Sequence, residues 1–301
     1  MTTQLALGLL VLAAQPLAGG DHTRELTVDG RERNYLLHIP PQETPTGGWP
    51  VVLVFHGGAS NTETMVRFCG MNDKADEAGF LAVYPSGTGR SSRVLTFNAG
   101  NCCGRAMRDQ VNDVKFTRAV LDDLARVTKV DPKRIYATGM SNGAIMCYLL
   151  ASEMADRLAA IAPVAGPMGT KTCSPSEPVS VCHFHGTADA FAPYRGGRGT
   201  RSVSRTDFYS VEHSINAWVK ANGCGNPTTK QLETKVDDGT QVTQTVYAGG
   251  RNGSEVVLYT IQGMGHTWPG RQSRARFLGV TTKNISANDV MWDFFQRHAK
   301  R

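Results

Sequence analysis

The stretch Ile135–Ala151, with the sequence IYATGMSNGAIMCYLLA, decides how this chain folds. Residues 135–138 form a short apolar run typical of a strand, and residues 144–151 are apolar on almost every face, as in a buried helix. Between them, GMSNG matches the glycine–x–serine–x–glycine pattern of a nucleophile elbow, whose strained serine is raised at the carboxyl end of the strand. Five-residue patterns also occur by chance, so the prediction that Ser141 is a nucleophile depends on the strand and helix beside it.

Strand-like and helix-like segments alternate on both sides of this stretch. Further strands are expected at 26–28, 34–39, 51–55, 80–84, 159–164, 179–185, 242–247 and 256–261, and helices at 64–78, 113–127, 211–222 and 286–301. Most of the strands are continuous apolar runs, as in parallel sheets that are buried on both faces. The alternation predicts a single α/β domain, doubly wound around a mostly parallel sheet, over residues 21–301. The Gly-, Ser- and Asn-rich segment 86–112 is expected to be a long functional loop.

The amino terminus resembles an export signal. Leu5–Ala14 is an apolar run of ten residues, too short to span a bilayer, and small residues follow at 18–20. We therefore expect residues 1–20 to be a signal peptide and the protein to be secreted, to the periplasm or the extracellular space. No cysteine follows the small residues, so we expect no membrane anchor.

The net charge of the chain, +6, is modest and favours no nucleic-acid partner. No basic helix with interleaved aromatic residues is present, so we expect no binding to DNA or RNA. Arginines cluster at 195–205 and at 271–276, within Gly- and Ser-rich sequence. These segments are either solvated loops or a basic rim that attracts a substrate bearing carboxylates.

The seven cysteines fit an exported protein that has one or more disulfides. Cys147 and Cys182 lie in apolar segments and are expected to be buried free thiols. Adjacent cysteines do not easily bridge each other, so we expect Cys102 or Cys103 to pair with Cys224. The chain has no CxxC pair and its histidines lack ligand spacing, which argues against a metal site.

Three residues with the chemistry of a catalytic triad follow three different strands: Ser141, Asp189 and His266. The order serine, acid, histidine is that of α/β-hydrolases. The carboxyl ends of the strands in a doubly wound sheet face one crevice, so residues far apart in sequence meet there. We expect His266 to remove the proton of the serine hydroxyl, and Asp189 to fix the tautomer of the histidine.

Other residues compete for two of these roles. The alternatives are His56, His183 and His185 for the base, and Asp207, Asp237 and Asp238 for the acid. His266 is favoured because it lies in a late glycine-rich loop, and Asp189 because it directly follows a buried strand. Asp113 is expected to cap the helix that begins there rather than to take part in catalysis.

The negative charge of a tetrahedral intermediate requires hydrogen-bond donors. We expect two backbone N–H groups to serve, that of Asn142 at the start of the buried helix and that of Gly58 in the loop HGGAS, with Ala59 as the near alternative. Substrate contacts are expected from Ser60, Asn98 and Trp268. The indole of Trp268, two residues after the proposed base, either forms a wall of the substrate pocket or packs beneath the loop and supports His266.

Five motifs together resemble one known family: HGGAS at 56–60, NAGNCCG at 98–104, GMSNG at 139–143, HGTAD at 185–189 and GHTWPG at 265–270. They are similar to those of the polyhydroxybutyrate depolymerase/feruloyl esterase family of secreted α/β-hydrolases, which is also related to acetylxylan esterases. The similarity covers residues 25–300. It implies a serine carboxylesterase with the triad described above and with no metal or organic cofactor.

The chain departs from this family in two ways. Gly58 stands where the family often has cysteine, and no linker or substrate-binding domain follows the last expected helix. We therefore expect hydrolysis of small, soluble or oligomeric hydroxycinnamoyl (feruloyl-type), acetyl or hydroxyalkanoate esters, including those of plant cell-wall polysaccharide. Depolymerisation of a polyester remains an alternative, as does acyl transfer by the same triad. A peptidase has no specific support, and a non-catalytic binding protein would be expected to have lost a triad residue.

Overall fold

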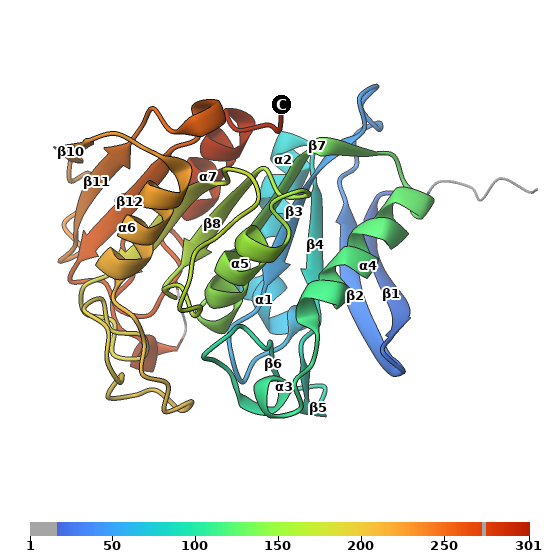
Figure 1. Ribbon diagram of the computed structural model, residues 1–301, viewed down its shortest axis with the longest axis horizontal. Helices are drawn as coiled ribbons and strands as arrows, with labels where there is room; N and C mark the ends of the chain where they lie inside the picture. The colour runs from blue at the N-terminus through green and yellow to red at the C-terminus, as the bar shows by residue number, and fades with distance from the viewer. Residues whose placement is uncertain (1–16, 273–274) are drawn as a thin grey trace, which may run out of the picture.

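The computed structural model describes residues 17–272 and 275–301, which fold around one ten-stranded sheet (Figure 1). Its strands lie in the order β1 (Gly20–Val28), β2 (Arg31–Ile39), β4 (Leu81–Pro85), β3 (Trp49–Phe55), β7 (Val130–Met140), β8 (Ala160–Val164), β9 (Ser180–Gly186), β12 (Val256–Gln262), β11 (Gln241–Tyr247) and β10 (Pro227–Gln231). The central strands, from β4 to β12, pair in parallel, and two antiparallel strands extend the sheet at each edge.

Helices cover both faces of the sheet. On the face towards the viewer in Figure 1 lie α4 (Asp113–Val127), α5 (Asn142–Glu153) and α6 (Val211–Asn222). Behind the sheet lie α1 (Thr62–Cys69), α2 (Met71–Ala78) and α7 (Ala287–Gln296). This arrangement confirms the predicted doubly wound α/β fold.

Strand β3 has no polar positions because both of its faces are buried. Val51, Leu53 and Phe55 pack into the core beneath α4 and α5, whereas Val52 and Val54 pack into the core beneath α1, α2 and α7. Successive side chains of a strand point to opposite faces, so a strand between two helical layers must be apolar at every position.

Several expected elements differ from the structure. The first strand begins at Gly20 and not at residue 26, and the last helix ends at Gln296 and not at the carboxyl terminus. The predicted helix 64–78 is divided at Gly70, which takes a left-handed conformation with φ 61° and ends α1 before α2 begins. The segment 86–112 is not a structureless loop. It holds the hairpin of β5 (Thr88–Ser91) and β6 (Val94–Thr96) and the short helix α3 (Gly104–Arg108).

The start of α4 also corrects an expectation. Asn112, not Asp113, caps the helix, because its side-chain oxygen accepts the N–H of Lys115 at 2.8 Å. The Asp113 carboxylate is buried and pairs with Arg33 at 2.7 Å. Asp113 also accepts the N–H of Asn98 at 2.7 Å, so the buried ion pair is bonded to the backbone of the 86–112 segment and stabilises it.

Most of the expected signal peptide, residues 1–16, lies outside the described residues, and its expected cleavage region at 18–20 includes Gly20, the first residue of β1. Within residues 17–272 and 275–301, no helix is both long enough and apolar enough to cross a bilayer.

Candidate active site

Ser141 lies at the sharp turn between β7 and α5. Its backbone has φ 57° and ψ −117°, a conformation that residues other than glycine rarely adopt. A Cβ at Gly139 would stand 2.7 Å from the carbonyl oxygen of Phe55, and a Cβ at Gly143 would collide with the same oxygen. The two glycines therefore allow the elbow helix to pass close to β3, as the sequence pattern indicates.

Asp189 and His266 form a buried hydrogen-bonded pair. Nδ1 of His266 lies 2.7 Å from Oδ2 of Asp189, and the other carboxylate oxygen accepts the N–H groups of Phe191 and Ala192 at 2.8 and 2.9 Å. Burial raises the pKa of Asp189, but the charge and hydrogen bond of His266 outweigh it, so the pKa is lowered overall. The carboxylate is thus held ionised and oriented by three donors.

Ser141 and His266 line one open cavity of ≈ 820 Å³ at the carboxyl ends of the central strands. Gly58, Ser60 and Asn142 line the same cavity. The structure therefore brings together five of the predicted site residues, and Asp189 adjoins them through its bond to His266.

The two predicted oxyanion donors are neighbours. A Cβ built on Gly58 would stand 3.5 Å from Cβ of Asn142, and one built on Gly57 would stand 3.7 Å from Cβ of Ser141. Asn142 is the first residue of α5, so its backbone N–H has no acceptor within the helix. Its side chain is occupied elsewhere: Oδ1 accepts the N–H of Phe97 at 2.8 Å and Nδ2 donates to the Phe97 carbonyl at 3.0 Å.

Comparison with known proteins identifies the family. Residues 33–201 match the family described as esterase PHB depolymerase. The chain belongs to this family. The esterase is 32% identical to the putative esterase NocK of Nocardia uniformis subsp. tsuyamanensis, over 93% of this chain and 84% of that protein. These matches confirm the resemblance drawn from the five motifs and make the chain a carboxylic ester hydrolase.

Other relatives carry more specific names. Feruloyl esterase B of Piromyces equi is 28% identical over 78% of this chain, which corresponds to 42% of that longer protein. Poly(3-hydroxyalkanoate) depolymerase C of Paucimonas lemoignei is 28% identical over 73% of this chain and 55% of its own length. Among solved structures, an acetyl xylan esterase from Aspergillus awamori shares the fold, with a TM-score of 0.55 and 14% identity over 91% of this chain and 99% of that one.

The competing histidine of the esterase, His56, shapes the loop beside Gly58. Nδ1 donates to the carbonyl of Gly57 at 2.8 Å, and Nε2 accepts the N–H of Gly87 at 3.1 Å. Burial lowers the pKa of His56 to about 4, so the ring is neutral near pH 7. With both nitrogens engaged, His56 supports the loop, as the sequence indicates.

Two predicted substrate contacts need correction. Trp268 is fully buried and does not line the cavity; its Nε1 donates to Oδ1 of Asn288 at 2.8 Å. Because Asn288 in turn donates to the carbonyl of Cys69 at 2.9 Å, the indole is a support beneath the His266 loop and not a pocket wall. Asn98 is also outside the cavity lining, because its amide donates to the carbonyl of Val111 at 3.0 Å and holds the 86–112 segment together.

The cysteine pairing differs from the expectation. Cys102 and Cys103 are joined by a cis peptide bond with their sulfur atoms side by side, and both line the cavity. Cys224 is free, so its expected pairing with the loop is wrong. Cys147 and Cys182 are buried free thiols, as predicted, and burial raises the pKa of each.

Several cavity residues were not predicted from the sequence. Phe191 stacks on the ring of His266, with 4.9 Å between ring centroids, and Phe277 lies 6.2 Å from Phe191. Their positions in loops follow no periodic pattern, and the only signal for Phe191 is its place two residues after Asp189. Among the described residues, the arginines that line the cavity are Arg90, Arg105 and Arg108, all from the 86–112 segment, and none belongs to the two clusters considered in the sequence.

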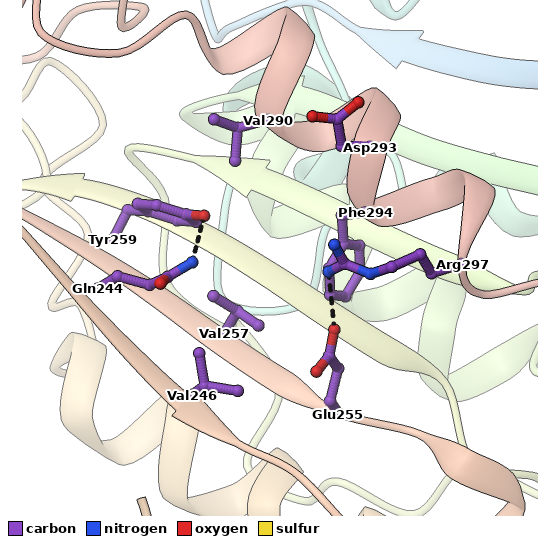
Figure 2. A pocket seen from close by; sticks show the side chains of 9 residues that line it. All are labelled: Gln244, Val246, Glu255, Val257, Tyr259, Val290, Asp293, Phe294 and Arg297. Carbon is purple, nitrogen blue, oxygen red and sulfur yellow. Dashed lines mark hydrogen bonds and ion pairs between the residues drawn. The ribbon is translucent and has the colours of Figure 1, made fainter. Parts of the chain in front are cut away.

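A smaller cavity of ≈ 140 Å³ lies on the face of the sheet that α7 covers, between α7 and strands β11 and β12 (Figure 2). Four of its polar side chains bond in pairs: Gln244 donates to Tyr259 at 2.6 Å, and Arg297 donates to Glu255 at 3.1 Å. It holds no candidate nucleophile. Among the described residues, no group of three or more His, Cys, Asp and Glu side chains is arranged to hold a metal ion.

Proposed function

We propose that this esterase is a secreted serine hydrolase that works through an acyl-enzyme on Ser141. The observation that carries the proposal is the 2.7 Å bond between Nδ1 of His266 and the ionised Asp189. A carboxylate accepts only, so Nδ1 carries a proton, and in the neutral form of the ring Nε2 then keeps its lone pair. Ser141 shares the cavity with that ring, and a histidine with a free Nε2 is the general base that a serine nucleophile requires.

The steps follow from these positions. Nε2 of His266 takes the proton of Ser141 Oγ while Oγ attacks the ester carbonyl, and the N–H groups of Asn142 and Gly58 stabilise the oxyanion. The tetrahedral intermediate collapses, and His266 returns the proton to the departing alcohol. Water then attacks the acyl-enzyme by the same route and releases the carboxylic acid and free Ser141.

The acyl group that we propose is a hydroxycinnamoyl group. An acetyl group would occupy a small part of a cavity of ≈ 820 Å³, whereas the rings of Phe191 and Phe277 offer apolar faces for an aromatic acyl chain. Relatives named feruloyl esterase support this choice. Smaller acetyl esters and hydroxyalkanoate oligomers fit the same space.

Polyester hydrolysis is the second candidate, and one observation favours it. Val94, Val203 and Phe277 line the cavity mouth with 53, 82 and 61% of their surface exposed. Apolar side chains exposed around an active site provide contact area for an apolar polymer. A relative named poly(3-hydroxyalkanoate) depolymerase C is consistent with this use. Secretion is proposed from the apolar leader Leu5–Ala14.

A substrate panel tests the proposal. The purified protein is assayed on methyl ferulate, p-nitrophenyl acetate, a soluble 3-hydroxybutyrate trimer and a polyester film, each with Ser141→Ala as control. We expect the highest kcat/KM on methyl ferulate and none of these activities in the variant. Adding an alcohol acceptor should leave free ferulate as the main product. Ester formation in preference to hydrolysis would indicate an acyltransferase, and release from the film alone would indicate a depolymerase.

A further inference from the structure

A chain of hydrogen bonds runs through the core behind Asp189. The hydroxyl of Tyr148 lies 2.9 Å from Nδ1 of His183, and Nε2 of His183 lies 3.0 Å from Nδ1 of His185. Nε2 of His185 lies 2.8 Å from the carbonyl oxygen of Ala192. All three side chains are fully buried. His183 and His185 are two residues apart on β9, so both point to the face that α5 covers.

When both rings are neutral, the acceptor at one end fixes every proton in the chain. The carbonyl of Ala192 can only accept, so Nε2 of His185 carries a proton. Neutral His185 then has an unprotonated Nδ1, which must accept from Nε2–H of His183. Nδ1 of His183 is in turn unprotonated and accepts the hydroxyl of Tyr148. With both rings neutral, this is the one arrangement in which each of these nitrogens has a partner.

The environment of the rings agrees with this arrangement. Burial and then the neighbouring His185 lower the pKa of His183 well below its usual value. Burial also lowers the pKa of His185, against the opposing effect of Asp189. Both imidazoles are therefore neutral near pH 7, and neither is available as the catalytic base.

The chain connects the two elements that carry the proposed nucleophile and acid. Tyr148 lies on α5, the helix that begins directly after Ser141. At the other end, Ala192 belongs to the turn that holds Asp189, because the N–H of Ala192 donates to Oδ1 of Asp189 at 2.9 Å. Nε2 of His185 also lies 3.5 Å from Oδ2 of Asp189, the oxygen that binds His266.

We propose that Tyr148, His183 and His185 are positioning residues, which set the Asp189 carboxylate against His266 by tying its turn to the helix of the nucleophile. They touch no substrate. The inference rests on the proposed function, since it assumes that Asp189 and His266 act as a catalytic pair. Its consequence is that a hydroxyl buried on α5 controls the alignment of the acid and base.

Two matched tyrosines allow a direct test. Tyr148→Phe removes the donor to His183, whereas Tyr136→Phe removes a buried hydroxyl that has no hydrogen-bond partner among the described residues. Both changes keep the ring and its packing. For Tyr148→Phe we expect kcat on methyl ferulate to fall roughly tenfold with KM unchanged, less than the ~10²-fold that a 1 Å misplacement can cost. For Tyr136→Phe we expect wild-type kinetics.

A second readout does not depend on turnover. The Nδ1 proton of His266, held against Asp189, should give a low-field proton NMR resonance in the wild type, and also in Ser141→Ala. We expect Tyr148→Phe to shift or broaden this resonance and Tyr136→Phe to leave it unchanged. An unaltered resonance and an unaltered kcat in Tyr148→Phe, with only a lower melting temperature, would show that the chain is structural and would overturn the inference. An active Ser141→Ala would instead refute the proposed function.

Substitution of His185 provides the rescue. His185→Gln can keep an N–H donor directed at the Ala192 carbonyl, whereas His185→Leu cannot. We expect the glutamine variant to retain several-fold more kcat than the leucine variant, and to retain the low-field resonance that the leucine variant loses. Equal kcat values in two folded variants would contradict a positioning role for this bond.

Discussion

The floor and the mouth of the main cavity are built in opposite ways. On the floor, Asp189 and His266 are only 5% and 6% exposed and form a hydrogen bond with each other. Asp189 also accepts a backbone N–H group, that of Phe191. At the mouth, Val203 and Phe277 are 82% and 61% exposed and project from loops. The floor has one arrangement that satisfies its hydrogen bonds, whereas the mouth can change without unpairing a buried group. We infer that the floor determines the reaction and the mouth determines which ester is accepted.

The topology explains this division. The floor residues follow β7, β9 and β12, three neighbouring or near-neighbouring parallel strands whose carboxyl ends meet. The mouth residues Val94, Val203 and Phe277 come from the longer connections, residues 86–112, 190–210 and 275–286. Changes on the floor should therefore reduce the rate on every ester alike, and changes at the mouth should discriminate between esters.

The largest effect is expected from the acid of the floor. Asp189→Asn should reduce kcat by about 10⁴-fold on methyl ferulate and on p-nitrophenyl acetate alike, because an amide cannot stabilise the imidazolium and favours the wrong tautomer. The controls are Asp207→Asn and Asp237→Asn, two of the three competing candidates, which are exposed and should retain wild-type rates. A much larger loss on one ester than on the other would place Asp189 in substrate recognition.

The next largest effect concerns His56 and pH. Its folded pKa is about 4, whereas its unfolded value is 6.5, so the unfolded state binds the extra proton. Stability should therefore fall as the pH drops from 6.5 to 4 and should level off below 4, with a total contribution of roughly 3 kcal/mol. Urea denaturation between pH 4 and 7.5 should show a shallower decline for His56→Asn than for the wild type or for exposed His213→Asn. Parallel curves for all three would exclude a buried neutral His56.

Trp268 tests whether the support beneath the floor is separate from the pocket. Trp268→Phe keeps a ring but leaves Oδ1 of Asn288 without its donor, which should lower the free energy of unfolding by about 1–3 kcal/mol. The fractional loss of kcat/KM should be the same for methyl ferulate and p-nitrophenyl acetate. A loss of kcat/KM confined to methyl ferulate would indicate that Trp268 contacts the acyl group of the substrate, contrary to its burial.

The smallest effect is expected at the mouth. Phe277→Ala should lower kcat/KM on methyl ferulate several-fold, equivalent to about 0.5–1.5 kcal/mol of aromatic contact, and should leave p-nitrophenyl acetate nearly unchanged. Val236→Ala, an exposed apolar residue outside the cavity lining, is the control. Equal losses of kcat/KM on both esters would mean that Phe277 affects the catalytic step and not the choice of ester.

Features that depend on local pattern could be predicted from the sequence. The elbow around Ser141 and the buried strands carry their own signal, because few local structures other than these require such glycine spacing or such unbroken apolar runs. The exposed edge strand β10, PTTKQ, has no apolar alternation and was missed. The division at Gly70 had a signal, a glycine inside a helical pattern, but such glycines are often tolerated in helices.

The site was predictable in its residues but not in the directions of its side chains. Trp268 stands two residues from His266, yet its indole points into the core towards Asn288. Asn98 likewise lies in a loop near the cavity but bonds to its own segment. Proximity in sequence does not determine orientation, which depends on partners that are distant in the chain. Cys224, which is free and pairs with neither Cys102 nor Cys103, is a further case.

The most direct test of the floor is to identify the residue that acts as the nucleophile, by trapping it as a phosphonyl adduct. The protein is mixed with a p-nitrophenyl phosphonate, digested, and mapped by mass spectrometry, alongside Ser141→Ala and Asp189→Asn. We predict one equivalent of label on Ser141 in the wild type, much slower labelling of the same serine in Asp189→Asn, and none in Ser141→Ala. Stoichiometric label on any other residue, or full labelling of Ser141→Ala, would contradict a nucleophilic role for Ser141.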